Sequence, residues 1–414
     1  MCLALRSSLL GLLLVSSAPA QAQEPTQRDL EAEIDALKLE MQKLRPKPTT
    51  EPKVPANKDP SMETDAEIIA ESPSILSSVD MRIWGRVVFN MTYDNFQGRP
   101  NTDFQNYVVA EGPDEFNFNP RDSRFGIGAS EEWGDWKAGA VIEIDFYGNN
   151  VGNNLIPRMR LGFVTASNES AGFSMRAGQD WTPIASQNPG TIDFGILAWG
   201  GNLWWRLPQL TFRQKLGDHV EALLSLLKHR TLDGMATEER SPWICGRMAY
   251  SGLLGGQKGL LAVNAGGRRV KIQGYDFKDW LIALEWNLPL HDLFSINGEV
   301  WTGEGIGGEF LRYGLDYNLV AGTTIGGTGG FFSIRSDVTK KLRFNIGLGI
   351  DDPDNSQTGT NSTFNRNEIA FVNGQYHFTK HFGVGIEFMN LRTQTTSNQD
   401  LTGERLTFST WFTF

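Results

Sequence analysis

Residues 341–351 read KLRFNIGLGID, and this stretch shows the pattern that decides the fold of the chain. Every second side chain is large and apolar, and the residues between them are charged, polar or glycine. Successive side chains of a β-strand point to opposite faces of the sheet. The stretch therefore predicts a strand with one polar face and one apolar face, the apolar face made by Leu342, Phe344, Ile346, Leu348 and Ile350.

The same alternation recurs along the chain from about residue 81. It is plain in residues 82–91, 136–146 and 382–388. A soluble β-sandwich shows a similar alternation. The pattern alone therefore predicts an all-β protein without selecting its architecture.

The lengths of the connections between the predicted strands do select an architecture. About sixteen strands can be placed, separated by gaps that are alternately long and short. The long gaps fall near residues 94–119, 148–155, 182–201, 232–241, 271–278, 303–327, 351–364 and 392–403, and the short ones near 131–134, 167–171, 215–218, 251–257, 289–292, 336–340 and 379–380. Long loops on one side and tight turns on the other are typical of outer-membrane barrels with both termini in the periplasm. The sequence thus predicts an antiparallel transmembrane β-barrel of about sixteen strands over residues 81–414.

The C-terminus supports a barrel inserted in outer-membrane lipid. Residues 406–414 read LTFSTWFTF, an alternating strand that ends on Phe414. Outer-membrane proteins typically end on such a strand, and the barrel-assembly machinery recognises it. We expect that machinery to be a partner of the chain through Phe414.

Composition narrows the class of protein further. The mean hydropathy is −0.30, and no apolar run after the first residues reaches the length of a membrane-spanning helix. Strands of a membrane barrel face lipid only at alternate residues, so this mean hydropathy is compatible with a barrel. The net charge of −10 argues against nucleic-acid binding.

The first 80 residues predict three segments before the barrel. Residues 1–22 have the basic residue, short apolar core and small-residue cleavage site of a secretory signal peptide. Its removal leaves Cys245 as the one cysteine, which excludes an internal disulfide framework. Residues 46–80 form a proline-rich linker.

Residues 23–45 predict a short coiled-coil helix, here called the stalk, which lies in the periplasm if the barrel is in the outer membrane of a Gram-negative bacterium. Its apolar residues follow the spacing 4-3-4-3 of a coiled-coil seam, at Leu30, Ile34, Leu37, Met41 and Leu44. So short a helix is marginal alone and gains stability from partner chains. An amphipathic helix folded on the chain itself is the alternative.

If the apolar rows of the strands face lipid, the residues between them face the lumen. The first five predicted strands then carry a row of arginines into the pore: Arg82, Arg86, Arg124, Arg158, Arg160 and Arg176. Arginine stays charged and offers a forked set of donors that suits carboxylate and phosphate groups. This predicts a preference for anions. The alternative is that the arginines pair with lumen acids, for which Glu143 and Asp145 are the adjacent candidates.

The connection over residues 182–201 is rich in proline, glycine and apolar side chains, unlike a loop that stays in water. We expect it to fold into the barrel as a constriction loop, with Gln187 and Asp193 as polar contacts. Packing against a neighbouring subunit is the alternative.

Other chemistry is weakly indicated. The glycine-rich runs at residues 303–308 and 326–330 lack the lysine and the strand-to-helix context of a phosphate loop. The five histidines show no metal-ligand spacing, so neither a metal site nor a cofactor is expected. An outer-membrane enzyme such as a phospholipase would need a serine and a histidine together on the lipid face, which the alternation does not give. The chain is therefore expected not to be an enzyme.

Taken together, the motifs RDSRFG (121–126), GDWK (134–137), EIDF (143–146), PRMRLGF (157–163) and GQDWTP (178–183), with the stalk, resemble the DcaP-like outer-membrane porins. The resemblance covers about residues 27–414. It implies a homotrimer of sixteen-stranded barrels, each with a periplasmic coiled coil, that passes small organic anions such as dicarboxylates. Phosphate-selective porins of the O and P type share the barrel and similar early motifs. Their pores are lined by lysines, whereas the row predicted here is arginine.

Overall fold

The structure is a computed structural model. It describes residues 79–98, 105–148, 155–228, 230, 237–239, 241–254, 257–311, 316–358 and 364–414. The predicted signal peptide, the stalk and nearly all of the linker lie outside these residues and stay predictions. The first strand begins at Asp80, next to the predicted start of the barrel.

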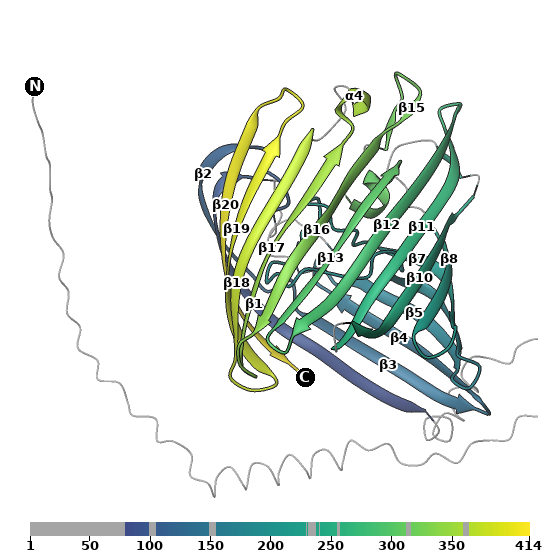
Figure 1. The fold of residues 1–414 in the computed structure, drawn as a ribbon. Helices are drawn as coiled ribbons and strands as arrows, with labels where there is room; N and C mark the ends of the chain where they lie inside the picture. The colour runs from purple at the N-terminus through teal and green to yellow at the C-terminus, as the bar shows by residue number, and fades with distance from the viewer. Residues whose placement is uncertain are drawn as a thin grey trace, which may run out of the picture. The chain divides into compact units, whose positions relative to one another are not determined.

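The described strands form one closed antiparallel barrel (Figure 1). β1 (Asp80–Gln97) pairs with β20 (Asp400–Thr413), which closes the sheet. β2 (Ala110–Asn119) and β3 (Arg124–Trp133) share one position beside β1, and β9 (Thr237–Glu239) and β10 (Trp243–Leu254) share one beside β11. The 18 strands of the sheet thus fill sixteen positions, which confirms the predicted fold. The others are β4 (Trp136–Asp145), β5 (Arg158–Asn168), β6 (Phe173–Trp181), β7 (Arg206–Lys215), β8 (Val220–Leu227), β11 (Gln257–Ile272), β12 (Tyr275–His291), β13 (Phe294–Glu304), β16 (Gly326–Asp337), β17 (Leu342–Pro353), β18 (Arg366–His377) and β19 (Phe382–Gln394).

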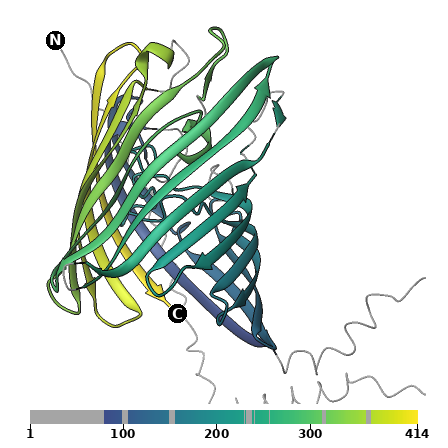
Figure 2. The same cartoon turned by 45° about the vertical axis from the view of Figure 1, so that its right-hand side comes forward.

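Short turns gather at one end of the barrel, which we call the turn end, and the C-terminus lies there too (Figure 2). The opposite, loop end carries small elements of its own: η2 (Gly307–Leu311), β14 (Tyr317–Asn318), β15 (Thr323–Thr324) and α4 (Asn355–Thr358). The prediction of a long loop near residues 271–278 is wrong. β11 and β12 continue through it to a two-residue turn, Gln273-Gly274, whose φ angles of 50° and 91° are those of a tight hairpin.

The two faces of each strand meet different surroundings. On β17, Ile346 and Leu348 keep 54% and 50% of their surface exposed on the outside, whereas Asn345 on the inside keeps 3%. Large exposed apolar side chains of this kind surround the barrel and suit a hydrocarbon environment. No helix among the described residues is long and apolar enough to cross a membrane.

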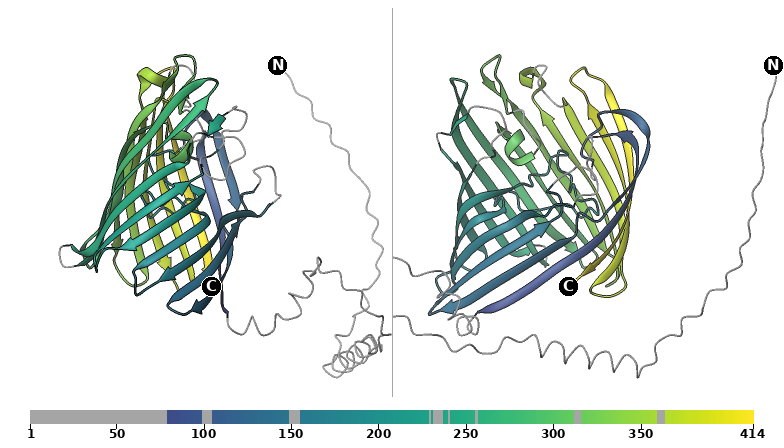
Figure 3. Two further views of the ribbon diagram at one scale, coloured as in Figure 1. Left: turned by 90° about the vertical axis from the view of Figure 1, so that its right-hand side faces the viewer. Right: turned by 180° about the vertical axis from the view of Figure 1, so that it is seen from behind.

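The wall of the barrel is uneven in height. Strands β4–β8 have 8 to 11 residues, whereas β11 and β12 have 16 and 17. Figure 3 shows the short strands together on one side. The predicted arginines come from β5 and β6, from β3 and from the N-terminal half of β1, which pairs with β3. We call the side of the barrel formed by these segments and β4–β8 the low wall, and the side formed by β11–β13 and β16–β19 the tall wall.

Candidate functional site: a basic wall and an inward loop

Residues 182–205, between β6 and β7, run through the inside of the barrel, and we call them the inward loop. The apolar residues that make this loop unlike a surface loop are buried: Ile184 and Leu197 keep 1% of their surface exposed and Trp199 keeps 2%. Ile184 packs in one cluster with Leu281 of β12, and Leu197 in another with residues of β16, β18 and β19. Four non-glycine residues of the loop have positive φ, a sign of a backbone held tightly by its surroundings.

Three buried glutamates of the tall wall hold the backbone of this loop. Glu387 on β19 accepts the N–H groups of Ile192 at 2.7 Å and Asp193 at 2.8 Å. Glu285 on β12 accepts the N–H of Ser186 at 2.5 Å, and Glu299 on β13 accepts that of Leu203 at 2.6 Å. All three keep at most 1% of their surface exposed. The inward loop therefore covers these three carboxylates, and they accept hydrogen bonds from backbone N–H groups of the loop that would otherwise have no acceptor.

Asp193, expected as a polar contact of the constriction, keeps only 4% of its surface exposed. Its carboxylate accepts a bond from Nη1 of Arg405 at 2.7 Å and from the N–H of Gly195 at 2.7 Å. Arg405 also forms two bonds to Asp94 of β1, at 2.7 and 2.8 Å. Burial raises the pKa of Asp193, and the Arg405 guanidinium only partly offsets this. The residue fastens the loop to the barrel. Gln187 is half-buried and donates to Ser186 Oγ at 3.4 Å.

The arginines Arg158 and Arg160 converge on one pair of acids. Arg158 makes two bonds to Asp145, at 3.0 and 2.7 Å. Arg160 reaches Glu143 and Asp145, each at 2.9 Å. A register shift between β4 and β5 lets side chains two residues apart on β5 meet the same carboxylate.

The other predicted arginines lie along the same side of the barrel. Arg86 and Arg124 share Asp122, at 3.4 and 2.9 Å. The remaining two differ: Arg176 pairs with Asp180 four residues on, and Arg82 lies over the ring of Trp84 at 5.0 Å. Pairing with acids, the alternative left open by the sequence, therefore describes five of the six arginines.

Pairing does not hide the positive charge. Side chains of Arg86, Arg124, Arg158 and Arg176 keep 32%, 30%, 34% and 41% of their surface exposed, and their acids keep 0 to 10%. Arg160 is the exception at 2%. A solute in the lumen thus meets guanidinium edges on the low wall, while the glutamates of the tall wall are covered.

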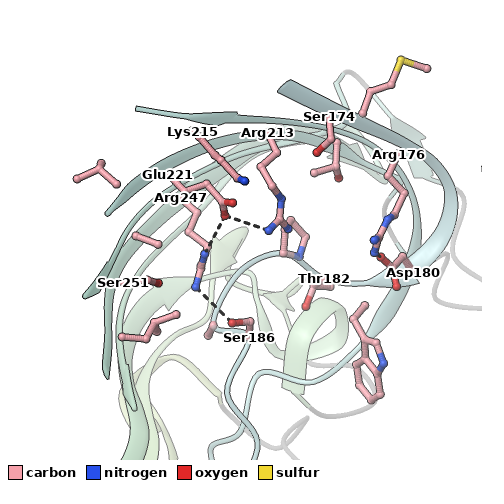
Figure 4. Close-up of a pocket in the computed structure, with 18 of the residues that line it drawn as sticks. Ser174, Arg176, Asp180, Thr182, Ser186, Arg213, Lys215, Glu221, Arg247 and Ser251 are labelled. Carbon is pink, nitrogen blue, oxygen red and sulfur yellow. Dashed lines mark hydrogen bonds and ion pairs between the residues drawn. The ribbon is translucent and has the colours of Figure 1, made fainter. Parts of the chain in front are cut away.

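A cavity of about 1010 Å³ lies beside the inward loop and extends toward the turn end (Figure 4). Its lining adds three basic residues that were missed from the sequence: Arg213 and Lys215 on β7, and Arg247 on β10. The sequence does carry a signal for them, because alternation along β7 and β10 places all three on the inward faces of these strands. All three lie on strands that follow the first five, to which the predicted row of arginines is confined.

A second charged cluster sits at the loop end. Glu309 of η2 pairs with Arg268 at 2.7 Å, and Arg268 also binds Asp279 at 2.6 Å. Burial raises the pKa of Glu309 to about 7 despite the Arg268 charge. Among the residues that the structure describes, no group of three histidine, cysteine or acidic side chains is placed to hold a metal ion.

These features define a closed, sixteen-stranded antiparallel barrel with a loop folded into its lumen. The chain is similar to the outer-membrane channel DcaP of Acinetobacter baumannii, with a TM-score of 0.73, 19% identity, and coverage of 82% of this chain and 98% of that one. It is also similar to an anion-selective porin from Comamonas acidovorans, with a TM-score of 0.59, 13% identity, and coverage of 81% and 100%. A trimer form of OmpT from Vibrio cholerae matches with a TM-score of 0.53, 9% identity, and coverage of 81% and 100%. The sequence itself matches no protein-family model and no curated protein.

Proposed function

We propose that this chain is an outer-membrane porin of the DcaP-like type that lets small anions diffuse in preference to cations. In this proposal the barrel sits as a homotrimer in the outer membrane of a Gram-negative bacterium, with residues 23–45 as a periplasmic stalk. The similarity of fold to porins supports the channel, and the trimer form of one of them supports the assembly. The apolar exterior supports the membrane location.

The preference for anions rests on one observation, the unequal exposure of opposite charges in the lumen. Glu285, Glu299 and Glu387 are buried beneath the inward loop. Arg86, Arg124 and Arg158 of the low wall keep about a third of their side-chain surface exposed, as Arg158 does at 34%. A permeating ion is therefore closer to positive than to negative charge. The forked donors of arginine suit carboxylates, which supports small organic anions such as dicarboxylates as the solutes.

The reversal potential of single channels in a salt gradient tests this proposal. We expect anion selectivity in the wild type. Arg158→Ser should lower the anion-to-cation permeability ratio about two- to fourfold, since one unit charge a few ångströms from the ion is worth about 1 kcal/mol in water before screening. Arg392→Ser removes the same charge from the exposed surface of β19 and should change little. A cation-selective wild type would overturn the proposal.

The phosphate-selective alternative differs in the residues that would hold the anion. Around the cavity, arginine predominates over lysine, with Arg176, Arg213 and Arg247 against Lys215. This supports a pore for carboxylates rather than one built on a lysine cluster. The expectation that the chain is not an enzyme stays a prediction, and a lipid-hydrolysis assay with and without calcium tests it.

A further inference from the structure

The cavity beside the inward loop holds a group of charges separate from the row of arginines at Asp145 and Asp122. Glu221 on β8 is its centre. In the sheet register Glu221 lies directly opposite Lys215 on β7 and Ala249 on β10. Arg213 and Arg247 stand two residues from those positions on the same inward faces. One carboxylate is therefore surrounded by three cations from its two neighbouring strands.

The contacts show that two of these cations share one oxygen. Arg213 Nη1 donates to Oε1 of Glu221 at 3.0 Å, and Arg247 Nη1 lies 3.8 Å from the same oxygen. Oε2 of Glu221 accepts no hydrogen bond from the described residues. Directly opposed side chains have Cβ atoms about 5 Å apart, so the Lys215 ammonium can reach the same space. Figure 4 shows the side chains of Lys215, Arg213, Glu221 and Arg247 gathered at one edge of the cavity.

The group is open to solute and tied to the loop. Arg213 keeps 44% of its side-chain surface exposed and Glu221 keeps 24%. Arg247 is nearly buried at 7%, because it also bonds Glu285 at 2.5 Å and Ser186 Oγ of the inward loop at 3.3 Å. In this group three cations face two carboxylates, Glu221 and Glu285, and Asp218 lines the same cavity from the β7–β8 turn.

We propose that Arg213, Lys215 and Arg247 form an anion-binding subsite of the pore, and that Glu221 keeps its affinity low by occupying the place of the ligand. The ligand class is a compact oxyanion, a carboxylate or a phosphate, whose oxygens accept from the donors that Glu221 now engages. Conduction requires sites that bind a solute strongly enough to admit it and weakly enough to release it. Glu221 keeps binding weak enough for release, because its carboxylate competes with the anion for Arg213 and repels the anion electrostatically.

This inference rests on the proposed function, and one set of recordings tests both. Chloride current through single channels is measured while inorganic phosphate is added, and citrate is used in a parallel series. Reversal potential in the same bilayers reports the anion preference itself. A wild type that prefers cations would refute the proposed function. An anion-selective wild type whose response to phosphate and citrate does not depend on Glu221 would refute the subsite alone.

The deciding variant is Glu221→Gln, which keeps the size of the side chain and removes its charge. We expect phosphate and citrate to block chloride current at about tenfold lower concentration, with longer block events, equivalent to about 1.4 kcal/mol. Asp218→Asn is the matched control, since Asp218 lines the same cavity from the β7–β8 turn and forms no ion pair among the described residues. It should shift the block less than twofold or so. Equal shifts in the two variants would show a general field effect and overturn the subsite.

A second variant separates loss of the site from loss of the fold. Arg213→Gln together with Lys215→Gln removes two exposed cations and leaves Arg247 on Glu285. We expect block by phosphate and citrate to weaken about tenfold or more, and heat-modifiable migration in detergent gels checks that the barrel is folded. Unchanged block in this double variant would also refute the subsite, because its exposed donors would be gone.

Discussion

Replacing Glu387 by alanine tests how the inward loop is held. The carboxylate accepts two loop N–H groups, from Ile192 at 2.7 Å and Asp193 at 2.8 Å, in a place with 1% exposure. Alanine leaves both donors without an acceptor, and each unsatisfied buried donor costs about 1–3 kcal/mol. The attached state of this part of the loop thus loses about 2–6 kcal/mol, which raises the population of displaced loops roughly 30-fold to more than ten-thousandfold.

The assay combines single-channel recording with limited proteolysis. We expect Glu387→Ala to show larger and noisier openings than the wild type, and to be cut by chymotrypsin within residues 182–205. Glu368→Ala is the control, because Glu368 lies on the adjacent strand β18, on its outer face, paired with Arg366. Heat-modifiable migration in detergent gels checks that both barrels are folded. Openings and protease resistance identical to the wild type would refute the idea that Glu387 holds the loop.

Three further outcomes are expected. Ile346 lies on the exposed outer face of β17, and Ile346→Lys should destabilise the inserted barrel by about 2–4 kcal/mol if the residue lies near the bilayer midplane. Insertion into liposomes should therefore fall for Ile346→Lys and stay normal for the control Ile346→Leu. Equal insertion of the two variants would show that Ile346 does not face lipid. Arg160→Ser leaves Glu143 and Asp145 without their buried partner and should cost about 3–5 kcal/mol in urea unfolding, more than Arg158→Ser; the reverse order would contradict the structural role of Arg160. Because burial raises the pKa of Glu309 to about 7, the stability it contributes is present at low pH and is lost as pH rises through 7. Amide exchange in residues 305–311 should thus correspond to about 1 kcal/mol less protection at pH 8 than at pH 6, and Glu309→Gln should abolish this difference.

The sequence predicted the barrel well because its signals are local. Alternation of side chains has a period of two wherever a strand separates lipid from lumen, as at Ile346 and Asn345. The position of the C-terminal strand followed from residues 406–414 alone. The boundary error at residues 271–278 also has a local cause. Residues 271–278 contain the polar and glycine residues typical of a loop, but β11 and β12 continue through them to a two-residue turn at Gln273 and Gly274.

The interior of the pore was harder to predict, because it depends on contacts between side chains that are distant in sequence. That Arg158 and Arg160 share Asp145 follows from a register shift that no local pattern reveals. Asp193 was expected to line the constriction, yet it binds Arg405, 212 residues away. The three glutamates on the tall wall were visible in the sequence, but their use as acceptors for loop N–H groups was not.

The sequence by itself determined which residues face outward and which face the lumen, because alternation along each strand sets this choice. It also determined that the connection between β6 and β7 is too apolar to remain in water. Only the tertiary structure decided which charges a solute can meet. Closing the barrel brings Glu285, Glu299 and Glu387 under the inward loop, where backbone donors cover them, and leaves the guanidinium groups of the low wall exposed. The chain carries a net charge of −10, yet its low wall exposes guanidinium groups, because burial and not composition decides which charged groups face the lumen.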